Sequence, residues 1–252
     1  MSHVPERVVS LVPSTTESIC LLGGTEALVG RTRYCTEPVE LERRVGSIGG
    51  TKNPDLEAVL ALRPDLVVAN AEENRAEDLE FLAVRVPVLV QTPRSVVEAA
   101  SDLRVLAKRL GKLEEAEPFL LRIEARIAAA EGEALGRGPR SVYYAIWRKP
   151  WMTVNRDTFV HDVLHLCGAR SVAFDADARY PELSPEQAAS RGVDLVLLAS
   201  EPWEFDEAQR AEVAAARCFG DAEVRLVDGR DFCWHGVRMA DGLGRALEAV
   251  RG

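Results

Sequence analysis

Asp65-Leu66-Val67-Val68-Ala69 is an apolar run of strand length that ends just before an acidic turn at Glu72. The chain repeats this pattern at Asp194-Leu195-Val196-Leu197-Leu198-Ala199, which precedes Glu201. In both copies a helix with proline at its start comes before the strand, and a polar stretch and another helical pattern follow it. Strands that alternate with helices are typical of α/β folds with parallel sheets. The repetition therefore predicts two similar α/β lobes that face one cleft.

Helix starts are predicted from residues that cap helices. We expect Asn53-Pro54 and Ser184-Pro185 to provide a cap and a first helical residue in the two copies. Ser14-Thr15-Thr16-Glu17 has the spacing of a capping box and predicts a third helix, which closes at Gly23. An ordinary doubly wound α/β protein is the alternative interpretation, because βα units recur in that fold as well.

A long helix is predicted between the two copies. Apolar residues recur at helical spacing from about Leu113 to Ala134, and Pro118 lies near the first turn. A helix of roughly 20 residues spans ~30 Å, which suits a rod between two lobes. The expected organisation is an N-terminal α/β lobe over 1–111, a bridging helix over 112–136 and a C-terminal α/β lobe over 137–252.

Composition excludes several classes of protein. The chain has 252 residues, 47% of them hydrophobic, and a net charge of -9. Arginines are scattered among acidic residues and form no basic stripe with aromatic residues, so no nucleic-acid partner is expected. No G-x-S-x-G, P-loop or G-x-G-x-x-G pattern occurs, so we predict that the chain is not an enzyme.

The start of the chain and its cysteines indicate a compartment. The first strand begins by Val8, which leaves no room for a secretory signal, and the five cysteines form no C-x-x-C pair. Both observations predict a cytoplasmic protein with reduced thiols. A periplasmic or cell-surface protein whose leader was trimmed is the alternative.

Ordered motifs through nearly the whole chain carry a resemblance to a known family. They are Arg7-Val8-Val9-Ser10-Leu11-Val12-Pro13-Ser14-Thr15-Thr16-Glu17, Gly49-Gly50-Thr51, Asn53-Pro54-Asp55-Leu56-Glu57, Leu62-Arg63-Pro64-Asp65-Leu66-Val67, Trp151-Met152-Thr153, His161-Asp162-Val163-Leu164, Cys167-Gly168-Ala169 and Phe232-Cys233-Trp234-His235-Gly236. With them the chain resembles the cobalamin-binding members of the helical-backbone substrate-binding proteins, a periplasmic-binding-protein-like family of ABC transporter receptors.

The resemblance implies an α/β fold of two lobes with mostly parallel sheets, joined by one long rigid helix. It also implies a monomer that binds cobalamin or a related corrinoid in the cleft, uses no catalytic cofactor and presents its ligand to the membrane subunits of an ABC importer. Haem or an iron siderophore is the alternative ligand. A cytosolic corrinoid escort or sensor is the alternative role.

Aromatic residues are the main candidates for ligand contacts. All four tryptophans lie at or just beyond predicted strand ends in the second half, where open α/β sheets place their binding crevices. Indole rings give a planar ligand flat apolar walls, although one or two of them are equally expected in the core. Together with the matching motifs, they give the predicted ligand-binding set Pro13, Ser14, Tyr34, Gly49, Gly50, Asn70, Trp147, Trp151, Trp203, Phe232, Trp234 and His235.

We also consider metal ligation by His235 and partner docking by two acidic residues. His235 is a candidate axial contact for a corrinoid or haem metal, but we favour a cleft-rim histidine without a metal bond, because no second ligand pair accompanies it. By the resemblance, Glu72 and Glu201 are the acidic residues that dock on basic pockets of the importer. Solvated loop carboxylates are the alternative for both.

Overall fold

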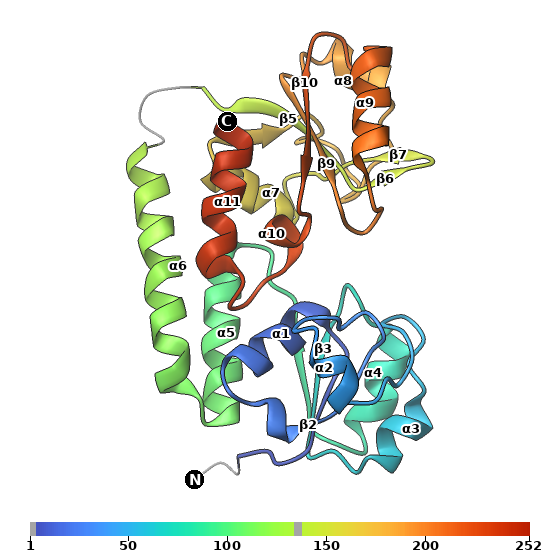
Figure 1. Cartoon of the computed structure of the whole chain (residues 1–252), viewed down its shortest axis with the longest axis vertical. Coiled ribbons are helices and arrows are strands. Elements are labelled where there is room, and N and C mark those ends of the chain that lie inside the picture. The colour runs from blue at the N-terminus through green and yellow to red at the C-terminus, as the bar shows by residue number, and fades with distance from the viewer. Residues whose placement is uncertain (1–3, 134–137) are drawn as a thin grey trace. The chain divides into compact units, whose positions relative to one another are not determined.

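Two four-stranded parallel sheets form the framework of the chain (Figure 1). The structure is a computed structural model that describes residues 4–133 and 138–252. The first sheet has the strand order β2-β1-β3-β4 and the second the order β10-β9-β5-β8. A short antiparallel pair, β6-β7, forms a separate hairpin. The prediction of an α/β fold with parallel sheets is confirmed.

The elements of the first half, in chain order, are β1 (Val8–Ser10), α1 (Pro13–Leu21), the 3-10 helix η1 (Thr25–Ala27), β2 (Leu28–Arg31), α2 (Leu41–Arg44), α3 (Leu56–Ala61), β3 (Leu66–Asn70), α4 (Ala76–Ala83), β4 (Val88–Gln91), α5 (Val96–Leu110) and α6 (Leu113–Glu133). Those of the second half are β5 (Arg140–Ala145), β6 (Trp147–Arg148), β7 (Trp151–Met152), α7 (Phe159–Leu166), β8 (Ala169–Ser171), α8 (Pro185–Ser190), β9 (Leu195–Ala199), α9 (Glu207–Ala216), β10 (Glu223–Val227), α10 (Arg230–Cys233) and α11 (Met239–Arg251).

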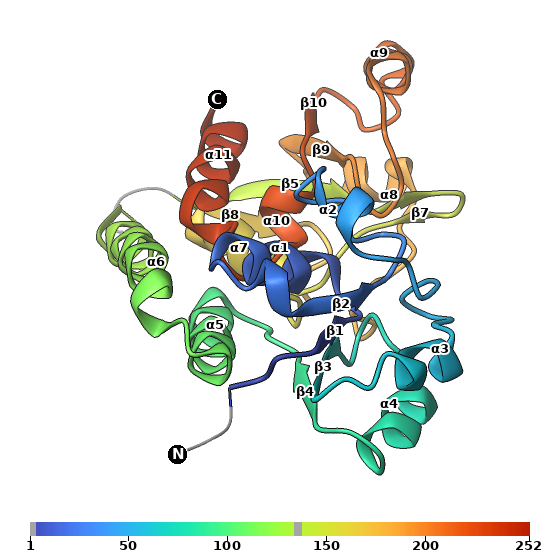
Figure 2. The same ribbon diagram turned by 60° about the horizontal axis from the view of Figure 1, so that its bottom comes forward.

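Helices cover both faces of the first sheet because its strands are apolar on both sides. Val8 and Val68 pack against α1 and α5, whereas Val9 and Val67 pack against α3 and α4. Figures 1 and 2 show these two pairs of helices on opposite sides of the strands. Successive side chains of a strand point to opposite faces, so a continuous valine run fills two cores at once.

The second sheet is built in the same way. Tyr143, Val196 and Leu198 pack toward α8 and α9, with Phe205 and Phe219 closing the same core. Figure 1 shows α7, α10 and α11 on the other side of the sheet. The two sheets therefore repeat one arrangement, as the two copies of the strand pattern predict.

The chain divides into two compact units that are not two uninterrupted halves. The N-terminal unit comprises the chain up to Pro93, Val97–Leu121 and the distant segment His235–Arg238. The C-terminal unit comprises Arg94–Val96, Arg122–Trp234 and Met239–Gly252. Helix α6 runs without interruption from Leu113 to Glu133 and contributes residues to both units. The boundaries 1–111, 112–136 and 137–252 stay a prediction, and residues 134–136 lie outside the described residues.

Helices α1 and α5 end just before the predicted glycines Gly23 and Gly111, but two of the three predicted helix starts are wrong. Helix α3 begins after Asp55, whose carboxylate accepts a hydrogen bond from the Ala58 amide, so Asn53 is not its cap. Helix α1 begins at Pro13 and has no side-chain cap. Only Ser184 forms the predicted cap, in a capping box with Gln187. Asp55, two residues closer to α3, caps this helix in place of Asn53. The Ser14 and Glu17 side chains form no capping box, because they contact residues far along the chain.

The internal repetition extends to a matched hydrogen bond before each central strand. The Asp65 carboxylate accepts hydrogen bonds from the amides of Glu6 and Arg7, at 2.8 and 2.9 Å, just before β1. The Asp194 carboxylate accepts one from the Ser141 amide at 2.8 Å, at the start of β5. In each sheet, an aspartate at the start of one strand therefore fixes the neighbouring strand.

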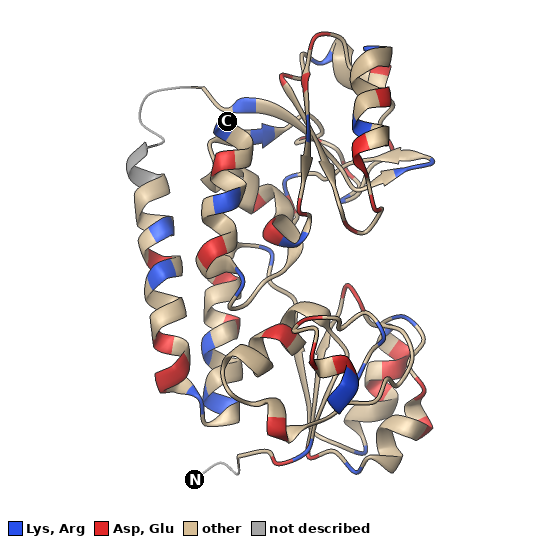
Figure 3. Cartoon of the chain, viewed as in Figure 1, with Lys and Arg blue, Asp and Glu red and all other residues tan. Residues whose placement is uncertain are grey.

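Acidic and basic residues are interspersed along the ribbon of both units (Figure 3). Among the helices of the described chain, none is both long enough and apolar enough to cross a bilayer.

Candidate functional site

The carboxyl ends of β1 and β3 bring two predicted residues of the N-terminal unit together. Ser14 lies at the start of α1, directly after β1, and Asn70 is the last residue of β3. Both are almost fully buried. Strands β1 and β3 are parallel neighbours, so their carboxyl ends meet at one edge of the sheet. This edge is the place where a ligand-binding crevice is expected in such a fold.

His235 joins these two side chains although it lies far along the chain. Its Nε2 is 3.3 Å from the Asn70 amide nitrogen and 3.4 Å from the Ser14 hydroxyl oxygen. The Asn70 amide oxygen accepts a hydrogen bond from the Glu72 amide, at 2.7 Å, which turns the Asn70 NH2 group toward the imidazole. Nε2 is therefore the acceptor, and the proton of the neutral ring sits on Nδ1.

Burial keeps this imidazole neutral. His235 is 6% exposed, and desolvation lowers its pKa to about 4. Both the low exposure and the two donors at Nε2 leave this nitrogen no open position for a metal. The arrangement makes His235 a fixed part of the sheet edge, and its candidacy as an axial ligand is not supported by this geometry.

The segment His235–Arg238 is anchored to α1 by further contacts. The Val237 amide donates to the Ser18 hydroxyl at 3.1 Å, and the Arg238 guanidinium forms a double ion pair with Glu17 at 2.6 and 3.0 Å. Gly236 has a positive φ of 98°, and a Cβ there would collide with the Ser18 hydroxyl. Glycine is thus required at this turn. Glu17, predicted to be part of a capping box, is instead one partner of this ion pair.

Tyr34 and Arg33 lie on the loop that follows β2. The Tyr34 side chain is 52% exposed, and the Arg33 guanidinium carbon lies 5.1 Å from its ring centroid. The Arg33 amide donates to the Gly49 carbonyl at 2.8 Å, which ties this loop to the two glycines. Gly49 has a φ of 105°, and a Cβ at Gly50 would lie 3.2 Å from the Arg33 Nη2. The glycine pair therefore forms a turn, and the Arg33 side chain lies against it.

Aromatic side chains form a cluster in the C-terminal unit. The rings of Trp147 and Trp203 meet edge to face at 4.9 Å, and Trp151 stacks on Phe205 at 5.8 Å. Trp147 sits on the β6-β7 hairpin and is 36% exposed. The indole nitrogen of Trp203 is buried and meets no acceptor among the described residues. The cluster offers partly open aromatic surface, and the unused Trp203 donor is enclosed within it.

Two predicted aromatic residues are parts of the core. Phe232 is 1% exposed and packs on the Tyr144 ring, with centroids 5.2 Å apart. Trp234 is 6% exposed. Neither ring presents a face to solvent, whereas Trp147, Trp151 and Trp203 are at least partly open.

The two predicted docking acids have different surroundings. Glu201 is half-buried and accepts a hydrogen bond from the Trp234 indole nitrogen at 2.8 Å. Glu72 is half-buried, and its backbone carbonyl accepts a hydrogen bond from the Lys52 ammonium at 2.6 Å. Each carboxylate follows an inner strand of its four-stranded sheet, β9 for Glu201 and β3 for Glu72. Their equivalent positions in the two units match the sequence prediction, and their role in docking stays a prediction.

Sequence reasoning missed Arg33, Phe205 and the anchor residues Ser18 and Arg238. Arg33 stands next to Tyr34 and offered a signal in its position. Contacts of Ser18 and Arg238 join residues more than 200 positions apart, and no local pattern indicates such pairs.

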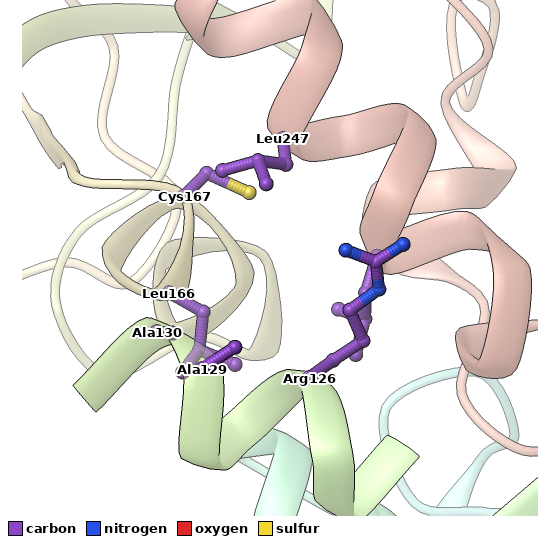
Figure 4. A pocket seen from close by; sticks show the side chains of 7 residues that line it. Arg126, Ala129, Ala130, Leu166, Cys167 and Leu247 are labelled. Carbon is purple, nitrogen blue, oxygen red and sulfur yellow. The ribbon is translucent and has the colours of Figure 1, made fainter. Parts of the chain in front are cut away.

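Other cavities lie in the C-terminal unit, away from the aromatic cluster. One of about 30 Å³ is lined by α6, α7 and α11 and includes Cys167, where burial raises the thiol pKa to about 12 (Figure 4). A surface depression of about 600 Å³ lies beside Arg170 and Phe174. Within residues 4–133 and 138–252, no group of three or more His, Cys, Asp or Glu side chains is placed to hold a metal ion.

Comparison with known proteins gives a consistent family. The family described as "Periplasmic binding protein" matches residues 8–216. A vitamin B12-binding protein of Pectobacterium carotovorum is 27% identical over 202 residues, which cover 79% of this chain and 73% of the relative. These matches confirm the family resemblance seen in the sequence motifs.

Solved structures share the fold over almost the whole chain. The periplasmic vitamin B12 binding protein of Vibrio cholerae has a TM-score of 0.81 at 20% identity and covers 98% of this chain and 97% of its own. The periplasmic heme-binding protein of Roseiflexus sp. RS-1, in its apo form, has a TM-score of 0.79 at 26% identity, with 97% of each chain covered.

Proposed function

Since the chain belongs to the periplasmic binding protein family, we propose that it binds cobalamin or a related corrinoid and presents it to an ABC importer. The observation that carries this proposal is the similarity to curated vitamin B12-binding proteins over 79% of the chain. The family and these relatives are binding proteins, and we propose that the chain likewise performs no catalysis of its own. Delivery to an importer implies that the protein works outside the cytoplasm.

Each unit offers one ligand-contacting surface in this proposal. In the N-terminal unit it comprises Tyr34, the glycine pair and the edge formed by Ser14 and Asn70. In the C-terminal unit it comprises the partly open rings of Trp147, Trp151 and Trp203. A corrin ring is large and planar with apolar faces, and exposed aromatic rings bind such faces with little loss of side-chain freedom. Of the remaining predicted residues, His235 contacts Ser14 and Asn70, whereas Phe232 and Trp234 are buried in the C-terminal unit.

Haem is the second candidate ligand. The heme-binding protein of Roseiflexus sp. RS-1 is 26% identical, and the exposed phenol of Tyr34 is of a type that ligates haem iron. An iron siderophore is a further alternative ligand, and a corrinoid escort is an alternative role, but no particular residue of these surfaces favours either.

Titration with cyanocobalamin, haemin and a ferric siderophore, followed by tryptophan fluorescence, tests the proposal. Cyanocobalamin is expected to quench the emission with saturation, since an absorbing ring would lie beside Trp147 and Trp203. Trp147→Phe should reduce the quenching, because it removes the most exposed of the four indole rings. Saturable quenching by haemin alone would favour the second candidate, and no quenching by any of the three would contradict the proposal.

A further inference from the structure

The loop between β2 and α2 carries an arginine without an acidic partner. Arg33 is exposed, and its side chain contacts Tyr34, with the Nη2 3.4 Å from the phenol oxygen. In the part of the chain that the structure describes, no carboxylate pairs with this guanidinium. Exposed arginines elsewhere do pair with acids, as Arg44 does with Glu26 and Arg210 with Glu207. In a chain of net charge -9, Arg33 is thus a cation open to an external anion.

Its position is set by the surrounding backbone. The Arg33 amide is hydrogen-bonded to Gly49, and the guanidinium lies against Gly50, where a Cβ would be 3.2 Å from Nη2 and 3.4 Å from the Tyr34 ring. A Cβ at Gly50 would collide first with the Asn53 side-chain oxygen and would also crowd the guanidinium and the phenol ring. Lys52 places a second cation on the same turn.

We propose that Arg33 binds the anionic group on the periphery of the metal chelate, which in cobalamin is the phosphodiester of the nucleotide loop. This inference rests on the proposed function and specifies the ligand further. A guanidinium offers two parallel N–H donors that match the oxygens of a phosphodiester or a carboxylate. The neighbouring Tyr34 ring provides the apolar surface for the ring system, so one loop recognises both parts of the ligand. The phosphodiester, rather than the propionate carboxylates of haem, is the source to which the proposal commits.

Calorimetric titration of Arg33→Gln with three ligands tests the inference. Cyanocobalamin should bind about tenfold more weakly than to the wild-type protein, because one charge-assisted contact is lost. Dicyanocobinamide, which lacks the nucleotide loop and its phosphate, should bind equally well to both proteins. Arg33→Lys keeps the charge but not the paired donors, so its affinity for cyanocobalamin should lie between those of the wild-type protein and Arg33→Gln. Arg43→Gln removes another exposed arginine of the same unit and is the matched control.

The outcomes separate this inference from the proposed function. Unchanged cyanocobalamin affinity in Arg33→Gln, or an equal loss for both corrinoids, would overturn the role of Arg33 while corrinoid binding stands. A loss for haemin alone would assign Arg33 to carboxylates and overturn the phosphodiester. Absence of corrinoid binding by the wild-type protein would overturn the proposed function itself. The exposed side chain makes little contact with the core, so equal thermal unfolding of the variant is expected and checks its fold.

Discussion

The indole nitrogen of Trp234 donates a hydrogen bond to the Glu201 carboxylate at 2.8 Å, within the C-terminal unit. The backbone of Gly229 lies close by, since a Cβ at this glycine would be 2.8 Å from the Glu201 backbone nitrogen. Glu201 therefore holds the loop after β9 against the loop that contains Trp234. A residue predicted to dock on a partner through its charge also has a structural role.

Substitution of Glu201 separates these two roles. Glu201→Gln keeps an oxygen that accepts the indole hydrogen bond and should change the free energy of unfolding little. Glu201→Ala leaves the buried indole N–H without its acceptor and should destabilise the protein by about 1–3 kcal/mol. Denaturant unfolding of both variants measures the difference.

Importer docking provides the second measurement on the same variants. If the charge of Glu201 binds a basic pocket, Glu201→Gln should weaken docking while its stability and corrinoid affinity remain those of the wild-type protein. Glu72→Gln is the matched variant in the other unit. Full docking by the double variant would refute the predicted role of both acids.

The ion pair of Glu17 and Arg238 should contribute strongly to stability. Their side chains are only 10% and 14% exposed, and two hydrogen bonds join them. Arg238→Ala leaves a buried carboxylate without its counter-charge and is expected to lower the free energy of unfolding by about 3–5 kcal/mol. Arg44→Ala, which breaks the exposed pair with Glu26, should lower it by less than about 1 kcal/mol. Equal shifts of the two denaturation midpoints would contradict this expectation.

His161 should make stability depend on pH in the acid range. It is 6% exposed, its Nε2 meets no partner among the described residues, and desolvation lowers its pKa to about 4. An unfolded histidine has a pKa of about 6.5. Between these values the unfolded chain binds a proton that the folded chain does not, so stability is complete above about pH 6.5 and falls as the pH decreases toward 4.

His161→Phe removes this proton uptake and keeps an aromatic ring beside Phe174, which His161 contacts at 5.2 Å. Relative to the wild-type protein, the variant should gain about 1 kcal/mol of stability on going from pH 6 to pH 5. Urea unfolding at both pH values measures the gain. His165→Gln, at an exposed position one turn along the same helix, should show no such gain, and a gain there instead would contradict the assignment to His161.

The matched aspartates before the central strands should have matched effects. Asp65→Ala removes the acceptor of two backbone amides and should destabilise the protein by about 1–3 kcal/mol. Asp194→Ala removes the acceptor of one amide and should have a smaller effect of the same sign. Asp177→Ala, at an exposed position, is the control and should leave the thermal unfolding midpoint unchanged. A larger loss for Asp194→Ala than for Asp65→Ala would contradict this ranking.

Much of the fold could be predicted from the sequence because its signals are local. The apolar runs of β3 and β9, the closing glycines Gly23 and Gly168, and the capping box at Ser184 each depend on a few neighbouring residues. The capping box predicted at Ser14 failed for a physical reason. The hydroxyl of Ser14 contacts His235 and the carboxylate of Glu17 pairs with Arg238, and both partners come from the other end of the chain.

The candidate site was less predictable than the fold. Position after a strand end selected all four tryptophans, but burial separates the partly open Trp147 from the enclosed Trp234. Whether a ring faces solvent depends on how loops from different strands pack, and spacing along the sequence does not contain that information. Arg33 was not predicted as a site residue, because its place beside Tyr34 does not by itself distinguish it and its lack of an acidic neighbour is seen only in the structure.

The return of His235–Arg238 to the N-terminal unit limits how this protein can be dissected. A fragment that stops after Leu121 would contain both β1 and α1 but would lose every contact that these four residues make. The Glu17 carboxylate would lose its ion pair with Arg238, and the Ser14 hydroxyl would lose its contact with His235. The N-terminal unit is therefore complete only when the chain has been made as far as Arg238.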